Sequence, residues 1–195
     1  MPPNVFLPAG LEAKYNVKTP MRDGVGLSAD IYFPRGQSGP LPAILWRTPY
    51  DNTDERIVNS AIFYAQHGYV FVAQDARGRN DSEGEFTPWV NEFNDGYDTI
   101  EWIGNQPWCD GNVGMAGSSY AGNVQWQAAA MGSRYLKAIV PRVIGNNLYE
   151  SPHYQGGAFQ LNWSATWTFR VAGRTWQNID LYNWDQLFST LPLKD

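Results

Sequence analysis

The sequence predicts an α/β fold, with a mostly parallel sheet that carries helices on both faces. Short apolar runs alternate with helix-like stretches over the first 145 residues, which is typical of parallel strands joined by helices. The runs at 43–46 and 69–73 are continuously apolar, as expected for strands that are covered on both sides. The chain has 195 residues, 43% of them hydrophobic, which is enough for one substantial core and part of a second unit.

The first predicted elements are two strands, at 14–18 and 25–33, joined by a turn at 21–24. Asp23-Gly24 favours a tight turn, and apolar residues alternate along the second strand. We therefore expect an antiparallel hairpin at the start of the sheet.

Strands and helices then alternate. A buried strand is predicted within 42–46, followed by a helix over 54–67 that Gly68 would end. A strand over 69–73 and a helix over 94–103 come next. The remaining elements are, in order, a strand over 112–116, a helix over 123–131 and a strand over 138–140.

The character of the sequence changes after residue 145. Residues 146–195 lose the alternation and become rich in Trp, Tyr, Phe, Asn and Gln. We expect two units: residues 1–145 form the sheet with its helices, and residues 146–195 begin a separate helical unit.

The most informative segment is 114–122, which predicts a strand, a tight turn flanked by glycine, and a helix. Gly117 stands two positions before Ser119, and small residues follow it. Such a turn pushes the serine hydroxyl out of the backbone and into a cleft. The pattern is a variant of the nucleophile elbow, with Ala121 where a second glycine usually stands. It places Ser119, and not Ser118, at the apex and indicates a serine hydrolase.

Composition excludes several other classes of protein. The net charge is −5 and no basic cluster is present, so we expect no nucleic-acid partner. No apolar run approaches a membrane span and no leader is visible, so we expect a cytoplasmic protein with no membrane partner. A single cysteine, Cys109, rules out an internal disulfide and suits a reducing compartment. We expect neither a metal nor a cofactor.

Several further motifs accompany the elbow. They are Thr48-Pro49-Tyr50-Asp51, Asp75-x-Arg77-Gly78 with Ser82-Glu83-Gly84, Asp95-Gly96-x-Asp98, Ile100-Glu101-Trp102 and Gln106-Pro107-Trp108. In this order and spacing, from Tyr15 onward, the chain resembles the cocaine esterase / X-Pro dipeptidyl-peptidase family of α/β-hydrolases. The resemblance implies an α/β-hydrolase fold in which 1–145 is the N-terminal part of the catalytic domain and 146–195 begins a helical cap.

The resemblance also implies a reaction. Members of this family cleave ester or amide bonds, X-Pro peptide bonds among them, through an acyl-enzyme. Ser119 would be the nucleophile, and the backbone N–H of Tyr120 and the hydroxyl of Tyr50 would stabilise the oxyanion. The cap would roof the pocket of a small-molecule ester or amide substrate. The candidate pocket residues in that region are His153, Trp163 and Trp167.

The catalytic base is the point at which the chain departs from the family. In α/β-hydrolases an acid and then a histidine follow the serine. His67 precedes Ser119, at the predicted end of a helix, and His153 lies in the aromatic segment with no strand before it. We therefore expect a truncated fragment that lacks the family's catalytic Asp and His and is inactive alone. The alternative is a non-catalytic remnant that acts at most as a module binding a small molecule or a protein.

Overall fold

The computed structural model describes residues 7–145, 147 and 149–190. Its main sheet has six strands in the order β1-β2-β4-β3-β5-β6. β4, β3, β5 and β6 are parallel, while β1 and β2 run antiparallel, which confirms the predicted mostly parallel sheet. The strands are β1 (Leu11–Pro20), β2 (Gly26–Pro34), β3 (Leu41–Thr48), β4 (Val70–Asp75), β5 (Cys109–Ser118) and β6 (Leu136–Arg142).

The first two strands form the predicted hairpin. The N–H of Met21 donates to the carbonyl of Val25 at 2.8 Å and closes the turn between them. β2 is buried along almost its whole length because alternate side chains enter the cores on the two faces of the sheet, Ile31 on one face and Tyr32 on the other. The polar side chains of β2 are therefore satisfied inside: Ser28 Oγ donates to Asn16 Oδ1, and the Asp30 carboxylate accepts from the N–H of Asn16.

Three helices cover the sheet: α1 (Glu55–Gln66), α2 (Glu92–Gly104) and α3 (Tyr120–Ala130). α1 begins one residue later than predicted, and Asp54 caps it by accepting from the N–H of Arg56. α3 begins three residues earlier than the sequence predicts, so it includes Gly122. A Cβ at Gly122 would lie 2.4 Å from Ile144 Cγ2 and 2.7 Å from the carbonyl oxygen of Arg142. The glycine therefore allows α3 to approach the chain that follows β6.

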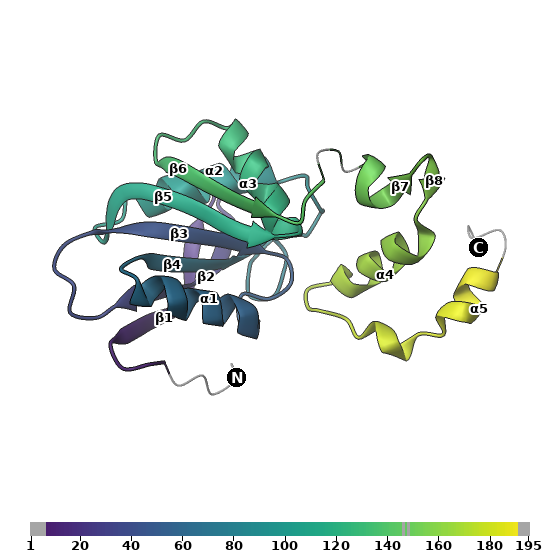
Figure 1. The fold of residues 1–195 in the computed structure, drawn as a ribbon, viewed down its shortest axis with the longest axis horizontal. Helices are drawn as coiled ribbons and strands as arrows, with labels where there is room; N and C mark the ends of the chain where they lie inside the picture. Colours follow the sequence, from purple (N-terminus) through teal and green to yellow (C-terminus); the bar gives the residue numbers. More distant parts are fainter. Residues whose placement is uncertain (1–6, 146, 148, 191–195) are drawn as a thin grey trace.

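Apolar side chains form one core on each face of the sheet. Ile100 of α2 and Val124 of α3 pack against one face, and Ile57 and Ala61 of α1 pack against the other. Helices on both faces are therefore confirmed (Figure 1). The parallel strands point toward the residues that follow 145, so the loops leaving β3, β4 and β5 gather at that end.

The residues after 145 form small elements that extend beyond the carboxyl ends of the strands (Figure 1). They are a π-helix η1 (Tyr149–His153), β7 (Tyr154–Gln155), β8 (Ala158–Phe159), α4 (Leu161–Val171), a 3-10 helix η2 (Ile179–Leu181) and α5 (Trp184–Ser189). The sequence did not predict the two-residue strands β7 and β8, which pair with each other. Within the predicted unit 146–195, residues 146, 148 and 191–195 lie outside the described residues. Across the described part of the chain, the helices are too short or too polar to cross a membrane.

Candidate active site

Ser119 lies alone at the turn between β5 and α3. Its backbone has φ 58° and ψ −126°, a region that a residue with a side chain occupies at a cost of about 1–3 kcal/mol. The turn is held by the N–H of Ser119, which donates to the carbonyl of Arg142 at 3.0 Å. Ser119 is exposed, whereas Ser118 is half-buried at the end of β5. The structure thus places Ser119 at the apex.

Gly117 explains how the strand and the helix approach so closely. It has φ 146°, and a Cβ there would lie 2.7 Å from the Cβ of Ala121 and 2.9 Å from its carbonyl oxygen. Both positions therefore have to be small, and Ala121 fits where a second glycine was the usual expectation.

Tyr50 comes from the loop after β3, at the same edge of the sheet. Its Oη lies 3.4 Å from Ser119 Oγ, and the indole Nε1 of Trp167 donates to the same Oη at 3.2 Å. An indole N–H can only donate, so it uses a lone pair of the phenol and leaves the phenol proton free to point toward Ser119. The adjacent N–H of Tyr120 is the first of α3 and has no acceptor within the helix. Two donors therefore lie beside the serine hydroxyl.

The side chain of Tyr120 is anchored beneath the turn. Its Oη donates to Glu92 at 2.7 Å and accepts from the N–H of Trp89 at 3.1 Å. Glu92 pairs with Arg47 at 2.6 Å, and all three side chains are buried. Burial raises the pKa of the Tyr120 phenol, and the negative charge of Glu92 raises it further, so the phenol stays a donor.

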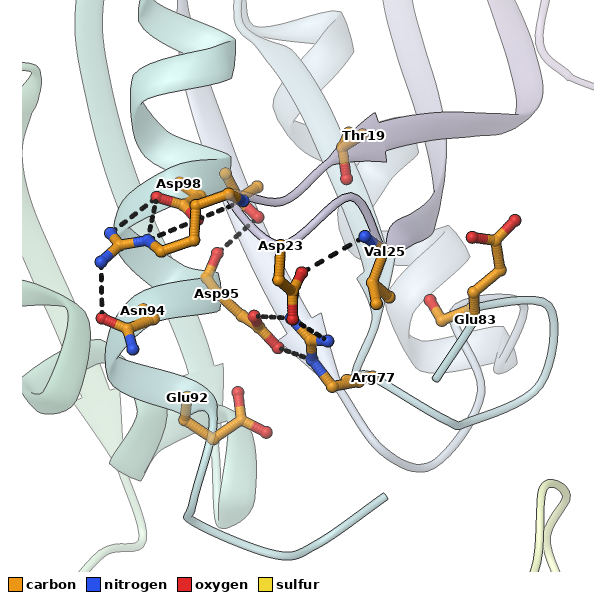
Figure 2. Close-up of polar contacts among 12 residues, drawn as sticks. Thr19, Asp23, Val25, Arg77, Glu83, Glu92, Asn94, Asp95 and Asp98 are labelled. Carbon is orange, nitrogen blue, oxygen red and sulfur yellow. Dashed lines mark hydrogen bonds and ion pairs between the residues drawn. The ribbon is translucent and has the colours of Figure 1, made fainter. Parts of the chain in front are cut away.

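A second ionic network holds the loop that follows β4. Figure 2 shows Arg77 between two carboxylates, with Asp95 of α2 at 2.6 Å and Asp23 of the β1–β2 turn at 2.7 Å. The hydrogen bond with Asp95 is the main reason that the pKa of Arg77 is raised. Arg77 thereby joins three segments that are distant in sequence.

Asp75, at the end of β4, is a buried carboxyl that supports the Tyr50 loop. It accepts from the N–H of Asn52 at 2.9 Å and from the side-chain amide of Asn80 at 2.8 Å. Among the described residues it has no ion-pair partner. Burial raises the pKa of Asp75 to about 7.

A cavity of about 330 Å³ opens above the serine. Stacked indoles form much of its wall: Trp163 and Trp167 are 6.1 Å apart with planes 3° apart, and Trp89 lies 6.1 Å from Trp167 at 12°. None of the described lining residues is charged. The lining residues are Tyr50, Trp89, Ser119, Tyr120, Asn123, Val143, Ile144, Gly145, Pro152, Trp163 and Trp167.

Trp89 and Asn123 also line this cavity, and the sequence alone does not identify either as a site residue. Trp89 follows Pro88 in a loop and has φ 70°, an unusual conformation that nothing in the local sequence predicts. Asn123 is on the first turn of α3, next to the elbow, so it lines the cavity as part of a helix that starts earlier than predicted.

Neither histidine contacts the serine. His67 ends α1, where its Nδ1 contacts the carbonyl oxygen of Phe63 at 2.7 Å. His153 is absent from the described cavity wall; its Nδ1 lies 3.1 Å from Ser164 Oγ and its ring meets the face of Trp163. Within the described residues no hydrogen bond joins either imidazole to Ser119, and no three His, Cys, Asp or Glu side chains are grouped to hold a metal ion.

Comparison with known proteins places these features in context. Residues 23–190 match the family described as X-Pro dipeptidyl-peptidase (S15 family). The chain is 47% identical over 159 residues to the cocaine esterase of a Rhodococcus species, which covers 77% of this chain and 28% of that protein.

Solved structures give the same result. A CocE/NonD family hydrolase from Staphylococcus aureus has a TM-score of 0.73 and 26% identity, over 81% of this chain and 32% of that one. An α-amino acid ester hydrolase has a TM-score of 0.72 and 29% identity, over 86% of this chain and 31% of that one. The chain thus spans about a third or less of the length of the relatives that it matches.

Proposed function

The chain belongs to the X-Pro dipeptidyl-peptidase (S15) family of α/β-hydrolases, and from this premise we propose that it carries the nucleophile and oxyanion donors of a serine hydrolase. The reaction would be cleavage of an ester or amide through an acyl-enzyme, an X-Pro peptide bond being one candidate. The observation that carries the proposal is the 3.4 Å contact of Tyr50 Oη with the exposed Ser119 Oγ.

In the proposed reaction, Ser119 Oγ forms a bond to the carbonyl carbon as its proton passes to a base. The carbonyl oxygen takes up the electron pair and receives hydrogen bonds from the Tyr120 N–H and the Tyr50 hydroxyl. The tetrahedral intermediate then expels the alcohol or amine with a proton, and water releases the acyl group from Ser119. Trp167, by donating to Tyr50 Oη, favours the orientation in which the phenol donates to the oxyanion.

The cavity supports a class of substrate. Its described wall offers indole and phenol rings and no charged side chain. A charged acyl group would lose hydration there without gaining an ion pair, which is unfavourable. We therefore propose a neutral acyl group, flat or apolar, carried by a small-molecule ester or amide.

A second candidate function arises because neither histidine is placed to act as the catalytic base in the described structure. Ser119 needs a partner to take its proton, and both imidazoles are engaged elsewhere in the described structure. This observation favours the alternative that the 195-residue chain by itself binds such compounds without hydrolysing them. A site with oxyanion donors and no base retains at most a rate on the order of 10³-fold over water.

A chimera tests the assigned roles. The matching segment of the Rhodococcus cocaine esterase, which is 47% identical, is replaced by that of this chain, so the remainder of the esterase supplies the other groups that ester cleavage needs. We expect Ser119→Ala to remove nearly all turnover of a benzoyl ester while binding survives. Tyr50→Phe should lower kcat by about 10²-fold or more. Ser118→Ala is the matched control, and near wild-type hydrolysis by Ser119→Ala would refute the assignment.

The isolated chain separates the two candidate functions. It is incubated with an activated aromatic ester beside its Ser119→Ala variant. Saturable turnover that depends on Ser119 would show that the chain alone is an enzyme and would point to His153 as a recruited base. Ester binding without turnover supports the binding module.

A further inference from the structure

Arg79, in the loop after β4, is a completely buried cation. Its Nε donates to the carbonyl of Pro49 at 2.7 Å, and its Nη1 donates to the carbonyl of Val171 at 2.7 Å and to that of Gly173. Among the described residues no carboxylate lies within ion-pair distance of it. Burial lowers the pKa of Arg79, and its Nη2 is buried without a hydrogen bond. Burying such a charge is costly, so the carbonyl groups must compensate it.

The carbonyls that Arg79 binds come from the two segments that meet at the phenol of Tyr50. Pro49 immediately precedes Tyr50. Val171 is the last residue of α4, where a cation also interacts favourably with the helix dipole. Trp167 lies one helical turn before Val171, on the same face of α4, and its indole donates to Tyr50 Oη at 3.2 Å. Arg79 and Trp167 thus join the Tyr50 loop to α4 at two points.

We propose that Arg79 is a positioning residue for Tyr50. By holding Pro49 and the end of α4 together, it fixes the Trp167 indole against the phenol and keeps the phenol proton directed toward Ser119. The inference rests on the proposed role of Tyr50 as an oxyanion donor, but the positioning is measurable without turnover.

Arg174 provides a matched comparison. It also ties the segment after α4 to the loop after β4, by donating to the carbonyls of Asn80, Ser82 and Gly84. None of these bonds reaches the loop of Tyr50. Loss of Arg174 should therefore loosen the same attachment and reach Tyr50 only through the ring of Trp176, which lies 5.3 Å from the Tyr50 ring, while the hydrogen bond from Trp167 stays.

The test follows the phenol by NMR in the 195-residue chain labelled with ¹³C at tyrosine Cζ, with the Tyr50 signal assigned by its loss in Tyr50→Phe. We expect Arg79→Gln to move this signal toward the value of a solvated phenol and to raise amide hydrogen exchange in α4 by about 10-fold or more. Arg79→Lys should shift the signal partway, because an ammonium group cannot reach all three carbonyls in the same geometry. Arg174→Gln should raise exchange near residue 174 and shift the Tyr50 signal much less than Arg79→Gln does, because only the contact with the Trp176 ring is affected.

Two results would overturn the proposal. One is an unchanged Tyr50 signal in Arg79→Gln while exchange in α4 rises, which would make Arg79 an anchor of the cap alone. The other is an equal shift in Arg174→Gln. Should Arg79→Gln fail to fold, Arg79→Lys carries the test: a partial shift of the Tyr50 signal supports the positioning role, and an unchanged signal refutes it. If Tyr50→Phe leaves kcat of the esterase chimera unchanged, the proposed function is refuted, whereas the positioning of Tyr50 by Arg79 is still supported by the NMR result.

Discussion

The two sides of the cavity are built differently. The sheet side, with the elbow and Tyr120, rests on buried charges and hydrogen bonds: Tyr120 is 1% exposed and Glu92 is 3% exposed. The other side, formed by α4 in the predicted cap and called the cap side below, consists of stacked rings, and Trp163 is still 41% exposed. The stability of the side that would hold the reacting atoms therefore depends on a buried network, in which removing one group leaves another without its partner. The stability of the cap side depends on contact area between apolar rings, which other large side chains can also supply.

The largest effect should come from breaking the ion pair under the elbow. Glu92→Ala removes the nearer carboxylate from buried Arg47, leaving only Asp95 at 4.0 Å, and also takes the acceptor from Tyr120 Oη. We expect it to lower the free energy of unfolding by about 3–5 kcal/mol. Glu55→Ala is the control, because Glu55 is also the first residue of a helix but is exposed, and its loss should cost about 0.3–1 kcal/mol. Equal losses in urea unfolding would contradict the weight given to the buried ion pair.

Asp75 should make stability depend on pH. Its pKa is about 7 in the folded state against about 3.9 unfolded, so the folded state binds the proton more tightly. The free energy of unfolding should fall as the pH rises from about 4 to about 7, by a limit of about 4 kcal/mol. Asp75→Asn should remove that fall, as measured by urea unfolding across this range.

Asp54 gives a comparison of opposite sign. Its hydrogen bond with Arg56 lowers the pKa of Asp54, so its stabilising contribution is present at neutral pH and is lost as the pH falls. Parallel pH curves for the wild type and Asp75→Asn would contradict the assignment of the pH effect to Asp75.

Overpacking at the elbow should have a smaller effect. Gly122→Ala would place a methyl group 2.7 Å from the backbone oxygen of Arg142, and we expect a loss of about 2–3 kcal/mol. In Gly132→Ala the new methyl group meets open space, so only the strain of φ 71° remains, about 1 kcal/mol. Chemical unfolding measures both, and a larger loss for Gly132→Ala would show that α3 can move away from β6.

The smallest effect is expected on the cap side. Trp163→Phe weakens the stack on Trp167 and should cost about 0.5–1 kcal/mol in thermal unfolding. Trp126→Phe, at an exposed position on α3, should stay within about 0.5 kcal/mol. A loss at Trp163 as large as that of Glu92→Ala would mean that the cap is held as firmly as the sheet side.

The sequence predicts the sheet side well because its signals are local. Gly68 after α1, the turn at Asp23-Gly24 and the glycine pattern around Ser119 each depend on neighbours in sequence. The sequence predicts too late a start for α3 because glycine is a poor helix former. Gly122 nevertheless lies within the helix, where its close contact with Ile144 leaves no room for a side chain.

The cavity wall was harder to predict. Trp89 reaches it through a left-handed backbone and a stack on Tyr120, whose ring centroid is 3.9 Å away, and neither follows from local sequence. Arg79 binds carbonyls 30 and 92 residues away along the chain, so no spacing rule could have identified its contacts.

The backbone of Ser119 has a consequence for how this chain tolerates change. At φ 58° and ψ −126°, glycine would be free of the strain that any side chain brings. Ser119→Gly should therefore unfold at a higher temperature than Ser119→Ala, although both lose the hydroxyl. Under selection for thermal resistance alone, variants would drift toward glycine at this position. The serine at the turn therefore sets a limit on the thermal resistance that the fold could otherwise reach.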